Sequence, residues 1–502
     1  MLSGTGLLVM GSGLMFSLLG TRASEANFSA LVTGLVMSAY FAGFVTGVYW
    51  CPRIIRKVGH IRAFAAMASV SSTMPILHAL WVDPLYWGIL RAVTGMCLVG
   101  LYIAIESWLN MSASKENRGR VFGAYTTVSW LTSAMGQWLL LVGPSLDFVP
   151  YVLASVLLSL ALVPISLTSV KEPLVVDVPK LQFKFLWSAS PIGVVGGVAS
   201  GLSLGAFYGL GAVYGQGLGF DSGGVASFMA WTIIGGAVAT WPLGWWSDRT
   251  DRRRVILFAC VLGLVLASLG FVMTQLGWTA SIPFLGFALG MYLFPVYGLS
   301  VSHGNDWVEP SRTLDMTGGL LLMHGIGAAA GPTLAGAVMD TVGVGGLMAY
   351  LALIALVYGG MVAWRLRHYP AVAVEEKFEF VPMAEGLSPA ALQLAPNVGD
   401  EVEGPPMPVA DSTVDVSAVA PDEAEPDEGT ARAESATEAS AASEASEASE
   451  ASEASEASEA SEASEASEAS EAGDAEMRAP PASSAMASAQ HNERPPSPAP
   501  RP

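Results

Sequence analysis

The sequence is poor in cysteine, in charged side chains and in the motifs of soluble enzymes. Three of its 502 residues are cysteine and 13% are charged, whereas 52% are hydrophobic. Cys97 and Cys260 fall inside apolar stretches and Cys51 lies at the end of one, so we expect no disulfide. A phosphate-binding loop, a Ser/His/Asp arrangement, a metal-binding cluster and a basic nucleic-acid-binding stripe are all missing. These absences argue against ATP as an energy source and against an enzyme, a cofactor or a nucleic-acid partner.

Long apolar stretches are what the sequence has instead. Twelve of them lie between Met1 and His368, and most are close to the roughly 20 residues that cross the hydrocarbon core of a bilayer. Their approximate bounds are 7–20, 28–50, 61–81, 84–105, 119–142, 148–167, 192–214, 226–246, 255–276, 282–301, 314–338 and 344–364.

Nearly all the positive charge in this part of the chain lies in every second connection between the stretches. The connections after the second, fourth, sixth, eighth and tenth stretches hold most Lys and Arg residues, and Arg365 and Arg367 follow the twelfth. The alternate connections hold a single basic residue, Arg22 beside Glu25, and acids such as Asp83, Asp147, Asp221 and Asp340. Because Lys and Arg in short loops stay on the cytoplasmic side, this pattern predicts a multi-pass protein of the bacterial inner membrane with both termini cytoplasmic. Membrane lipids are the expected partners of the basic face.

The net charge of −19 divides between two unlike parts of the chain. Residues 1–370 carry +5, whereas residues 371–502 carry −24 and include ten consecutive Ser-Glu-Ala triplets over 443–472. Such a composition buries too little apolar surface to fold, so we predict a disordered acidic tail over 369–502. The tail is either a spacer or a binding segment. The spacer hypothesis predicts that it is dispensable for transport, even when the chain is truncated after Lys377.

A weak internal repeat indicates that the twelve stretches form two halves of six stretches each. Thr94-Gly95-Met96 with Tyr102 corresponds to Leu289-Gly290-Met291 with Tyr297 at an offset of 195 residues. Repeats of half the domain length are typical of transporter folds, although apolar helices also resemble one another by composition. We predict an N-terminal bundle at 1–170, a cytoplasmic linker at 171–190 and a C-terminal bundle at 191–368.

A motif after the eighth stretch resembles the loop motif of the major facilitator superfamily, Gly-x-x-x-Asp-Arg-x-Gly-Arg-Arg. It reads Gly244-Trp-Trp-Ser-Asp-Arg-Thr-Asp-Arg-Arg-Arg254. The resemblance implies a latch that holds the cytoplasmic side closed, formed by Gly244, Asp248, Arg249, Arg252 and Arg253. An Asp at a helix end is suited to a neighbouring helix start, for which we expect Thr313 and Leu314. Asp251 replaces the family's glycine, and a generic basic loop is the alternative.

The corresponding segment of the first half departs from this motif. It has Gly59, but Arg56 stands where the acid would be. We therefore expect no carboxylate latch there.

The fourth stretch carries a charged stripe. Arg91-Ala-Val-Thr-Gly95 is similar to the superfamily's Arg-x-x-x-Gly signature, and Tyr102 and Glu106 lie within about 60° of Arg91 on a helix. A charge inside a span normally faces the bundle interior or a wet cavity. Arg91, Tyr102 and Glu106 are therefore candidates for a substrate- or proton-handling face. The alternative is an Arg that reaches the outer surface and a Glu held by the inner loops.

Other polar residues inside the stretches are weaker candidates for a central cavity. Tyr40, Gln137, Tyr208 and His324 belong to this group, together with Ser129 and Trp130. Such residues also serve as interhelical hydrogen-bonding groups. His324 alone is suited to titrate near neutral pH and to couple transport to protons.

The most distinctive stretches resemble the YcaD-like group of bacterial major facilitator proteins over about residues 1–370. They are Ile105-Glu-Ser-Trp-Leu-Asn110, Asn117-Arg-Gly-Arg-Val121, Trp241-Pro-Leu-Gly244, Phe294-Pro-Val296 and Gly331-Pro332. The resemblance implies an all-α integral membrane fold with twelve transmembrane helices in two pseudo-symmetric six-helix bundles. It implies a secondary active transporter of a small molecule that works by alternating access, driven by protons or by the substrate gradient. Because no charge-rich binding site is apparent in the sequence, we expect a neutral, amphipathic or weakly charged substrate, with proton coupling and with efflux favoured over uptake. The alternative is a membrane-embedded sensor or scaffold that signals through its acidic tail.

Overall fold

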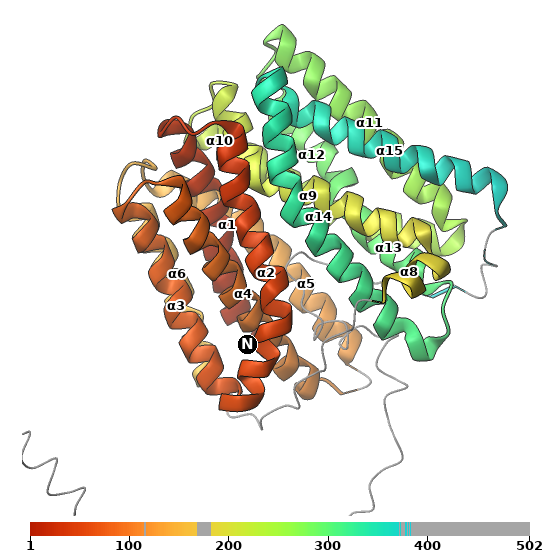
Figure 1. Cartoon of the computed structure of the whole chain (residues 1–502), viewed down its shortest axis with the longest axis horizontal. Helices are drawn as coiled ribbons and strands as arrows, with labels where there is room; N and C mark the ends of the chain where they lie inside the picture. The colour runs from red at the N-terminus through yellow and green to blue at the C-terminus, as the bar shows by residue number, and fades with distance from the viewer. Residues whose placement is uncertain are drawn as a thin grey trace, which may run out of the picture. The chain divides into compact units, whose positions relative to one another are not determined.

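The structure is a computed structural model that describes residues 1–114, 117–167, 182–370, 372, 377, 378, 380 and 382 (Figure 1). These residues form helices and connections without any strand. The predicted disordered tail lies outside the described residues except at its start, and so does most of the predicted linker at 171–190.

The first half consists of six membrane crossings. They are α1 (Leu2–Glu25), α2 (Ala30–Val58), α3 (His60–Leu80), α4 (Pro84–Ser112), α5 (Arg118–Trp138) with the 3-10 turn η1 (Leu139–Val142), and α6 (Val149–Leu160) with α7 (Leu162–Ser166).

The second half begins with a short helix, α8 (Phe183–Ala189), and then repeats the six crossings. These are α9 (Pro191–Gly217), α10 (Ser222–Arg249), α11 (Arg252–Leu276), α12 (Ile282–Leu293) with α13 (Pro295–Asn305), α14 (Thr313–Val342) after the 3-10 turn η2 (Pro310–Arg312), and α15 (Gly346–His368).

Length and composition allow ten of the described helical segments to cross a membrane, if α12 and α13 are taken together. The other two crossings are α5, which is rich in Ser and Thr, and the shorter apolar segment Val149–Ile165. The predicted twelve-helix all-α membrane fold is confirmed. Odd-numbered crossings run one way and even-numbered crossings the other, so the connections gather at two ends. We call the end with Arg53, Arg120 and Arg252 the basic end and the end with Asp83, Asp221 and Asp340 the acidic end.

Proline divides two of the crossings. α6 stops at Leu160 because Pro164 has no N–H to donate to the Leu160 carbonyl group and its ring clashes with that turn. Pro295 has the same effect between α12 and α13. Each crossing is therefore divided into two helices where the sequence predicted one continuous stretch.

Aspartate side chains cap two of the helices that start at the acidic end. Asp83 accepts a hydrogen bond from the Tyr86 N–H at 2.9 Å and caps α4, and Asp221 accepts one from the Gly224 N–H at 2.8 Å and caps α10. Side-chain acceptors of this kind satisfy N–H groups that have no partner within the helix. Asp83 and Asp221 therefore stabilise helix starts at the acidic end of the molecule.

The connection between α2 and α3 is tighter than the sequence predicted. The apolar stretches 28–50 and 61–81 predict a basic connection between them, but α2 continues to Val58 and α3 begins at His60. Gly59 alone makes the turn, with φ of 85°, a value that suits glycine. Arg53, Arg56 and Lys57 therefore project from a helix end.

Close glycine contacts are repeated in the two halves. A Cβ on Gly95 would lie 2.0 Å from the Tyr40 carbonyl oxygen, which brings α4 against α2. A Cβ on Gly290 would lie 1.9 Å from the Thr232 carbonyl oxygen, which brings α12 against α10 in the same way. The two glycines are those of the internal repeat, so the repeat records a shared packing contact.

The largest contact between the halves is that of α2 with α14, which lie side by side (Figure 1). A Cβ on Gly34 would come within 2.3 Å of the Pro332 carbonyl oxygen, and a Cβ on Gly336 within 2.3 Å of the Ala30 carbonyl oxygen. The Ser38 and Thr333 hydroxyl groups are 2.8 Å apart in the same interface. All these residues belong to the acidic-end portions of the two helices.

Candidate functional site

A cavity lies between the two halves near the middle of the helices. Its wall is contributed by α1, α2, α4 and α5 of the first half and by α9 and α14 of the second half. Seven aromatic side chains line it, namely Phe16, Tyr40, Phe41, Phe44, Tyr102, Trp130 and Tyr208. Ser12, Ser129, Ser133 and His324 are the polar lining residues other than tyrosine and tryptophan. This is the predominantly apolar lining, with a few placed polar groups, that is typical of small-molecule sites.

Four of the predicted pathway residues lie on this wall. Tyr40 comes from α2, Tyr102 from α4, Tyr208 from α9 and His324 from α14. Residues far apart in the sequence are therefore brought to one cavity. Sequence reasoning did not find Phe16, Phe41 and Phe44, because a phenylalanine in a membrane helix is equally expected to face lipid.

His324 is held within the second half. Its Nδ1 is 2.9 Å from the Ser200 hydroxyl oxygen on α9, and its ring centroid is 4.5 Å from that of Tyr297 on α13. These contacts orient the imidazole at the edge of the cavity.

Arg91 is buried behind the wall of the cavity. Its guanidinium carbon lies 4.3 Å from the ring centroid of Phe16 and 4.4 Å from that of Tyr40, and its side chain is 1% exposed. Cation–π contact with two aromatic rings stabilises a charge that would be costly in lipid. Phe16 and Tyr40 therefore separate Arg91 from the cavity in this conformation.

Glu106 and Gln137 are also buried, and each contacts a neighbouring helix. The Tyr125 hydroxyl group on α5 donates to Glu106 Oε1 at 2.6 Å. Gln137 accepts a short hydrogen bond from Ser17 on α1, and its Nε2 donates to the Gly13 carbonyl oxygen at 3.3 Å. Neither residue is among those that line the cavity.

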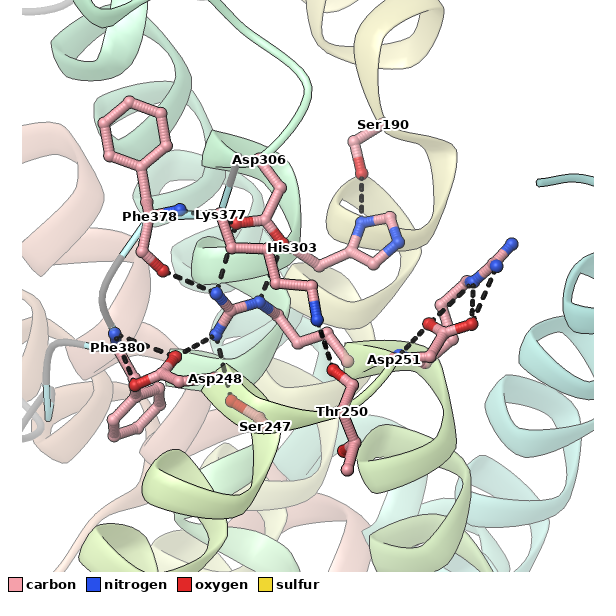
Figure 2. A network of polar contacts seen from close by, with 12 residues as sticks. Ser190, Ser247, Asp248, Thr250, Asp251, His303, Asp306, Lys377, Phe378 and Phe380 are labelled. Carbon is pink, nitrogen blue, oxygen red and sulfur yellow. Dashed lines mark hydrogen bonds and ion pairs between the residues drawn. The ribbon is translucent and has the colours of Figure 1, made fainter. Parts of the chain in front are cut away.

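A charge cluster at the basic end, formed by Asp248, Arg252 and Asp306, includes two residues of the predicted latch. Arg252, only 1% exposed, donates to Asp306 at 2.8 and 3.1 Å, to Ser247 Oγ at 2.9 Å and to Asp248 Oδ1 at 3.0 Å (Figure 2). Asp306, at the end of α13, was not predicted, because it lies 54 residues from Arg252 in the sequence. Burial raises the pKa of the Asp306 carboxyl above its ordinary value, although the charge of Arg252 acts in the opposite direction.

The partners of Asp248 differ from those we predicted. The carboxylate accepts hydrogen bonds from Arg252 and from the Phe380 backbone N–H, instead of meeting the helix start at Thr313 and Leu314. The motif is also helical where a loop was expected, because Gly244 and Arg249 both belong to α10. The guanidinium of Arg249 lies 4.1 Å from the Trp245 ring centroid, on an exposed surface.

Asp251 replaces glycine without distorting the turn. Its φ is −57°, and its carboxylate caps α11 by accepting from the Arg253 N–H at 3.0 Å. The Arg253 side chain also pairs with this carboxylate at 2.8 Å. Burial alone would raise the pKa of Asp251, but these bonds and the charges of Arg253 and Lys377 outweigh it and lower that pKa.

Comparisons with known proteins agree with this architecture. The family model of the Major Facilitator Superfamily matches residues 1–305. An uncharacterized MFS-type transporter of Enterobacter sp. (strain 638) is 26% identical over 381 residues, which cover 74% of this chain and 96% of the relative. The uncharacterized MFS-type transporter YcaD of Salmonella typhimurium (strain LT2) is 25% identical over 365 residues, which cover 71% of this chain and 93% of YcaD.

Solved structures show the same fold at low sequence identity. The nucleoside transporter NupG is 14% identical with a TM-score of 0.59, over 73% of this chain and 99% of NupG. A bacterial homolog of the human lysosomal transporter Spinster, in an inward-facing and unoccupied conformation, is 13% identical with a TM-score of 0.61, over 75% of this chain and 97% of the homolog. Together with the family match over more than half of the sequence, these likenesses identify the chain as a member of the major facilitator superfamily.

Proposed function

We propose that the protein is a secondary active transporter that moves a small molecule across the bacterial inner membrane by alternating access. The observation that carries the proposal is the cavity between the two halves, to which both halves contribute side chains. A site at such an interface is exposed to one side or the other as the halves rock about it. Membership of a transporter family is consistent with this role.

The lining of the cavity favours a neutral, amphipathic or weakly charged substrate with a planar or aromatic part. Aromatic rings provide apolar contact and stacking, while the hydroxyl groups of Tyr40, Tyr102 and Tyr208 and the imidazole of His324 supply a few hydrogen bonds. Arg91 and Glu106 are not among the lining residues, which supports a substrate without a full charge.

Proton coupling and export are part of the proposal. His324 borders the cavity and carries an imidazole, a group that can accept and release a proton, and Glu106 is a buried carboxyl group on the α4 stripe. Amphipathic compounds enter cells through the bilayer without a carrier, so a protein with this cavity is most useful as an exporter. The Lys/Arg asymmetry supports a cytoplasmic basic end and cytoplasmic termini.

A rival function is a membrane-embedded sensor or scaffold that signals through its acidic tail. The unlike composition of the tail, with its Ser-Glu-Ala triplets, is the observation that favours it. The two functions differ in whether a solute crosses the membrane.

The deciding experiment is a flux assay in proteoliposomes with a panel of metabolites and amphipathic drugs, with and without a pH gradient. Tyr208→Ala and Trp130→Ala are expected to raise KM or abolish flux of the transported compound. Trp241→Ala is the matched control, because Trp241 is 69% exposed on α10 and lies outside the cavity. If folded protein moves no compound faster than empty vesicles do, the sensor hypothesis replaces transport.

A further inference from the structure

Three residues beyond the last helix contact the charge cluster at the basic end. The Phe378 N–H donates to Asp306 Oδ1 at 3.1 Å, and the Phe380 N–H donates to both Asp248 oxygens at 3.1 Å (Figure 2). Lys377 Nζ donates to the Thr250 carbonyl oxygen. Each of the two clustered carboxylates is therefore bound by one backbone N–H of this short segment.

All five N–H groups of the Arg252 guanidinium have a hydrogen-bond acceptor only when Phe378 is docked at the cluster. A guanidinium has five N–H donors, and four of them are directed at Asp306, Ser247 and Asp248 within the helical bundle. The fifth donates to the Phe378 carbonyl oxygen at 2.6 Å. Because Arg252 is buried, the segment supplies a partner that no other residue of the described chain provides.

The side chain of Phe380 fits a position that only glycine leaves open. A Cβ built on Gly244 would lie 2.0 Å from Phe380 Cδ1, so the ring occupies the space that any other side chain at 244 would fill. Phe380 also packs against the hydrophobic core. The ring of Phe378, in contrast, points away from the cluster in Figure 2. The segment thus combines backbone recognition with one anchoring side chain.

The charges of the segment and its site are complementary. Lys377 adds a positive charge next to Asp248, Asp251 and Asp306, which are its favourable neighbours, while Arg252 opposes it. Burial and Arg252 together lower the pKa of Lys377 below its ordinary value.

We propose that Lys377, Phe378 and Phe380 form a clasp, a built-in ligand that docks on the basic end of the second half and regulates alternating access. Both oxygens of Asp248 accept from the Phe380 N–H, so a helix of the first half that approached this carboxylate would compete with the clasp. The clasped structure is also the one whose halves meet at the acidic end, through Gly34 and Gly336. On this proposal, the docked clasp favours the conformation with a closed acidic end, and closing the basic end displaces it.

Docking itself is tested without a substrate, by hydrogen exchange and mass spectrometry on the full-length chain in nanodiscs. The amides of Phe378 and Phe380 are expected to exchange at least tenfold more slowly than amides of the Ser-Glu-Ala repeat. Phe380→Ala and Gly244→Ala should remove this protection. Phe378→Ala should retain it, because the backbone of Phe378 makes the contacts. Exchange as fast as that of the repeat in the unaltered protein would overturn the proposal.

Regulation is tested by the reactivity of a cysteine at the interface of the halves. Ser38→Cys, with Cys51, Cys97 and Cys260 replaced by serine, places a thiol where Ser38 contacts Thr333, so it reacts only when the acidic end opens. Phe380→Ala is expected to raise the labelling rate about two- to tenfold, and Phe378→Ala to leave it unchanged. If Phe380→Ala loses amide protection but labels at the unaltered rate, the clasp docks without regulating. This second test depends on alternating access, whereas the first does not.

Discussion

Asp340, near the end of α14, accepts a hydrogen bond of 2.9 Å from the backbone N–H of Ala30, the first residue of α2. Its second oxygen accepts from the Leu31 N–H at 3.2 Å. An acid from one half therefore faces the positive end of a helix in the other half. The sequence predicts a contact between an acid and a helix start for Asp248 with Thr313 and Leu314 at the basic end. The structure has such a contact at the acidic end instead, where it joins the two halves.

Loss of the Asp340 charge should weaken closure of the acidic end. A charge at an exposed helix terminus contributes about 0.3–1 kcal/mol, so Asp340→Asn should shift the conformational equilibrium about two- to fivefold toward an open acidic end. The labelling rate of Ser38→Cys measures this shift. Asp221→Asn is the control, because Asp221 caps its own helix and does not bridge the halves. Equal rates for both variants would contradict a role for Asp340 in closure.

Small side chains should be essential where α2 and α14 touch. Gly336→Leu is expected to force the helices apart at the acidic end and to reduce flux at least tenfold, because a Cβ there would already lie 2.3 Å from the Ala30 carbonyl oxygen. Gly360→Leu should be tolerated, since nothing lies within 4 Å of a Cβ at that position. Comparable flux in the two variants, at equal membrane abundance, would show that this contact is not needed.

Gln137 should affect stability more than substrate recognition. Gln137→Ala removes hydrogen bonds to Ser17 and Gly13 that join α5 to α1. Interhelical hydrogen bonds in membranes contribute about 0.6 kcal/mol on average and up to about 1.7 kcal/mol, so we expect a Tm lower by a few degrees. The KM of a transported compound should not change. Gln275→Ala, at an exposed position of α11, is the control for the thermal melt.

The geometry of Arg91 should matter as well as its charge. Arg91→Lys keeps the charge but lacks the planar group that lies over Phe16 and Tyr40, so flux should fall about tenfold. Arg91→Ala should abolish flux. Both are measured in proteoliposomes at matched protein content, and wild-type flux in Arg91→Ala would remove this residue from the transport pathway.

Two truncated proteins should distinguish the effect of losing the acidic tail from the effect of losing the clasp. Truncation after residue 384 should leave transport per molecule unchanged, as the spacer hypothesis predicts for the acidic repeat. Truncation after Lys377 removes Phe378 and Phe380 and should increase Ser38→Cys labelling as Phe380→Ala does. Identical labelling in the two truncated proteins would place the clasp outside the regulatory mechanism.

The membrane fold could be predicted from the sequence because hydropathy and Lys/Arg asymmetry are local properties. The cavity could be predicted only in part. Tyr40, Tyr208 and Gln137 are all polar residues within spans, yet the first two line the cavity and Gln137 binds α1. Helical periodicity separates lipid-facing from interior positions, but it does not separate an interior cavity from an interior contact.

The basic-end cluster shows a second limit of sequence reasoning. The motif predicted Asp248 and Arg252, which are four residues apart on neighbouring helix ends. Asp306 contacts Arg252 and the Phe380 N–H contacts Asp248. Neither residue was predicted, because these contacts depend on the tertiary fold, which brings the end of α13 and the chain after α15 to this cluster. Composition also placed the start of the tail directly after α15, which concealed Phe380 in a segment expected to lack contacts.

The glycine contact between α2 and α14 has an electrical consequence. Backbone lies against backbone from Gly34 to Gly336, which leaves no space for a file of water molecules between the two helices. A chain of water would conduct protons, so this contact insulates the membrane as well as blocking the substrate. A carrier that remains in an energised membrane between cycles must not discharge the ion gradient, and the paired glycines serve that requirement along the contact of α2 with α14.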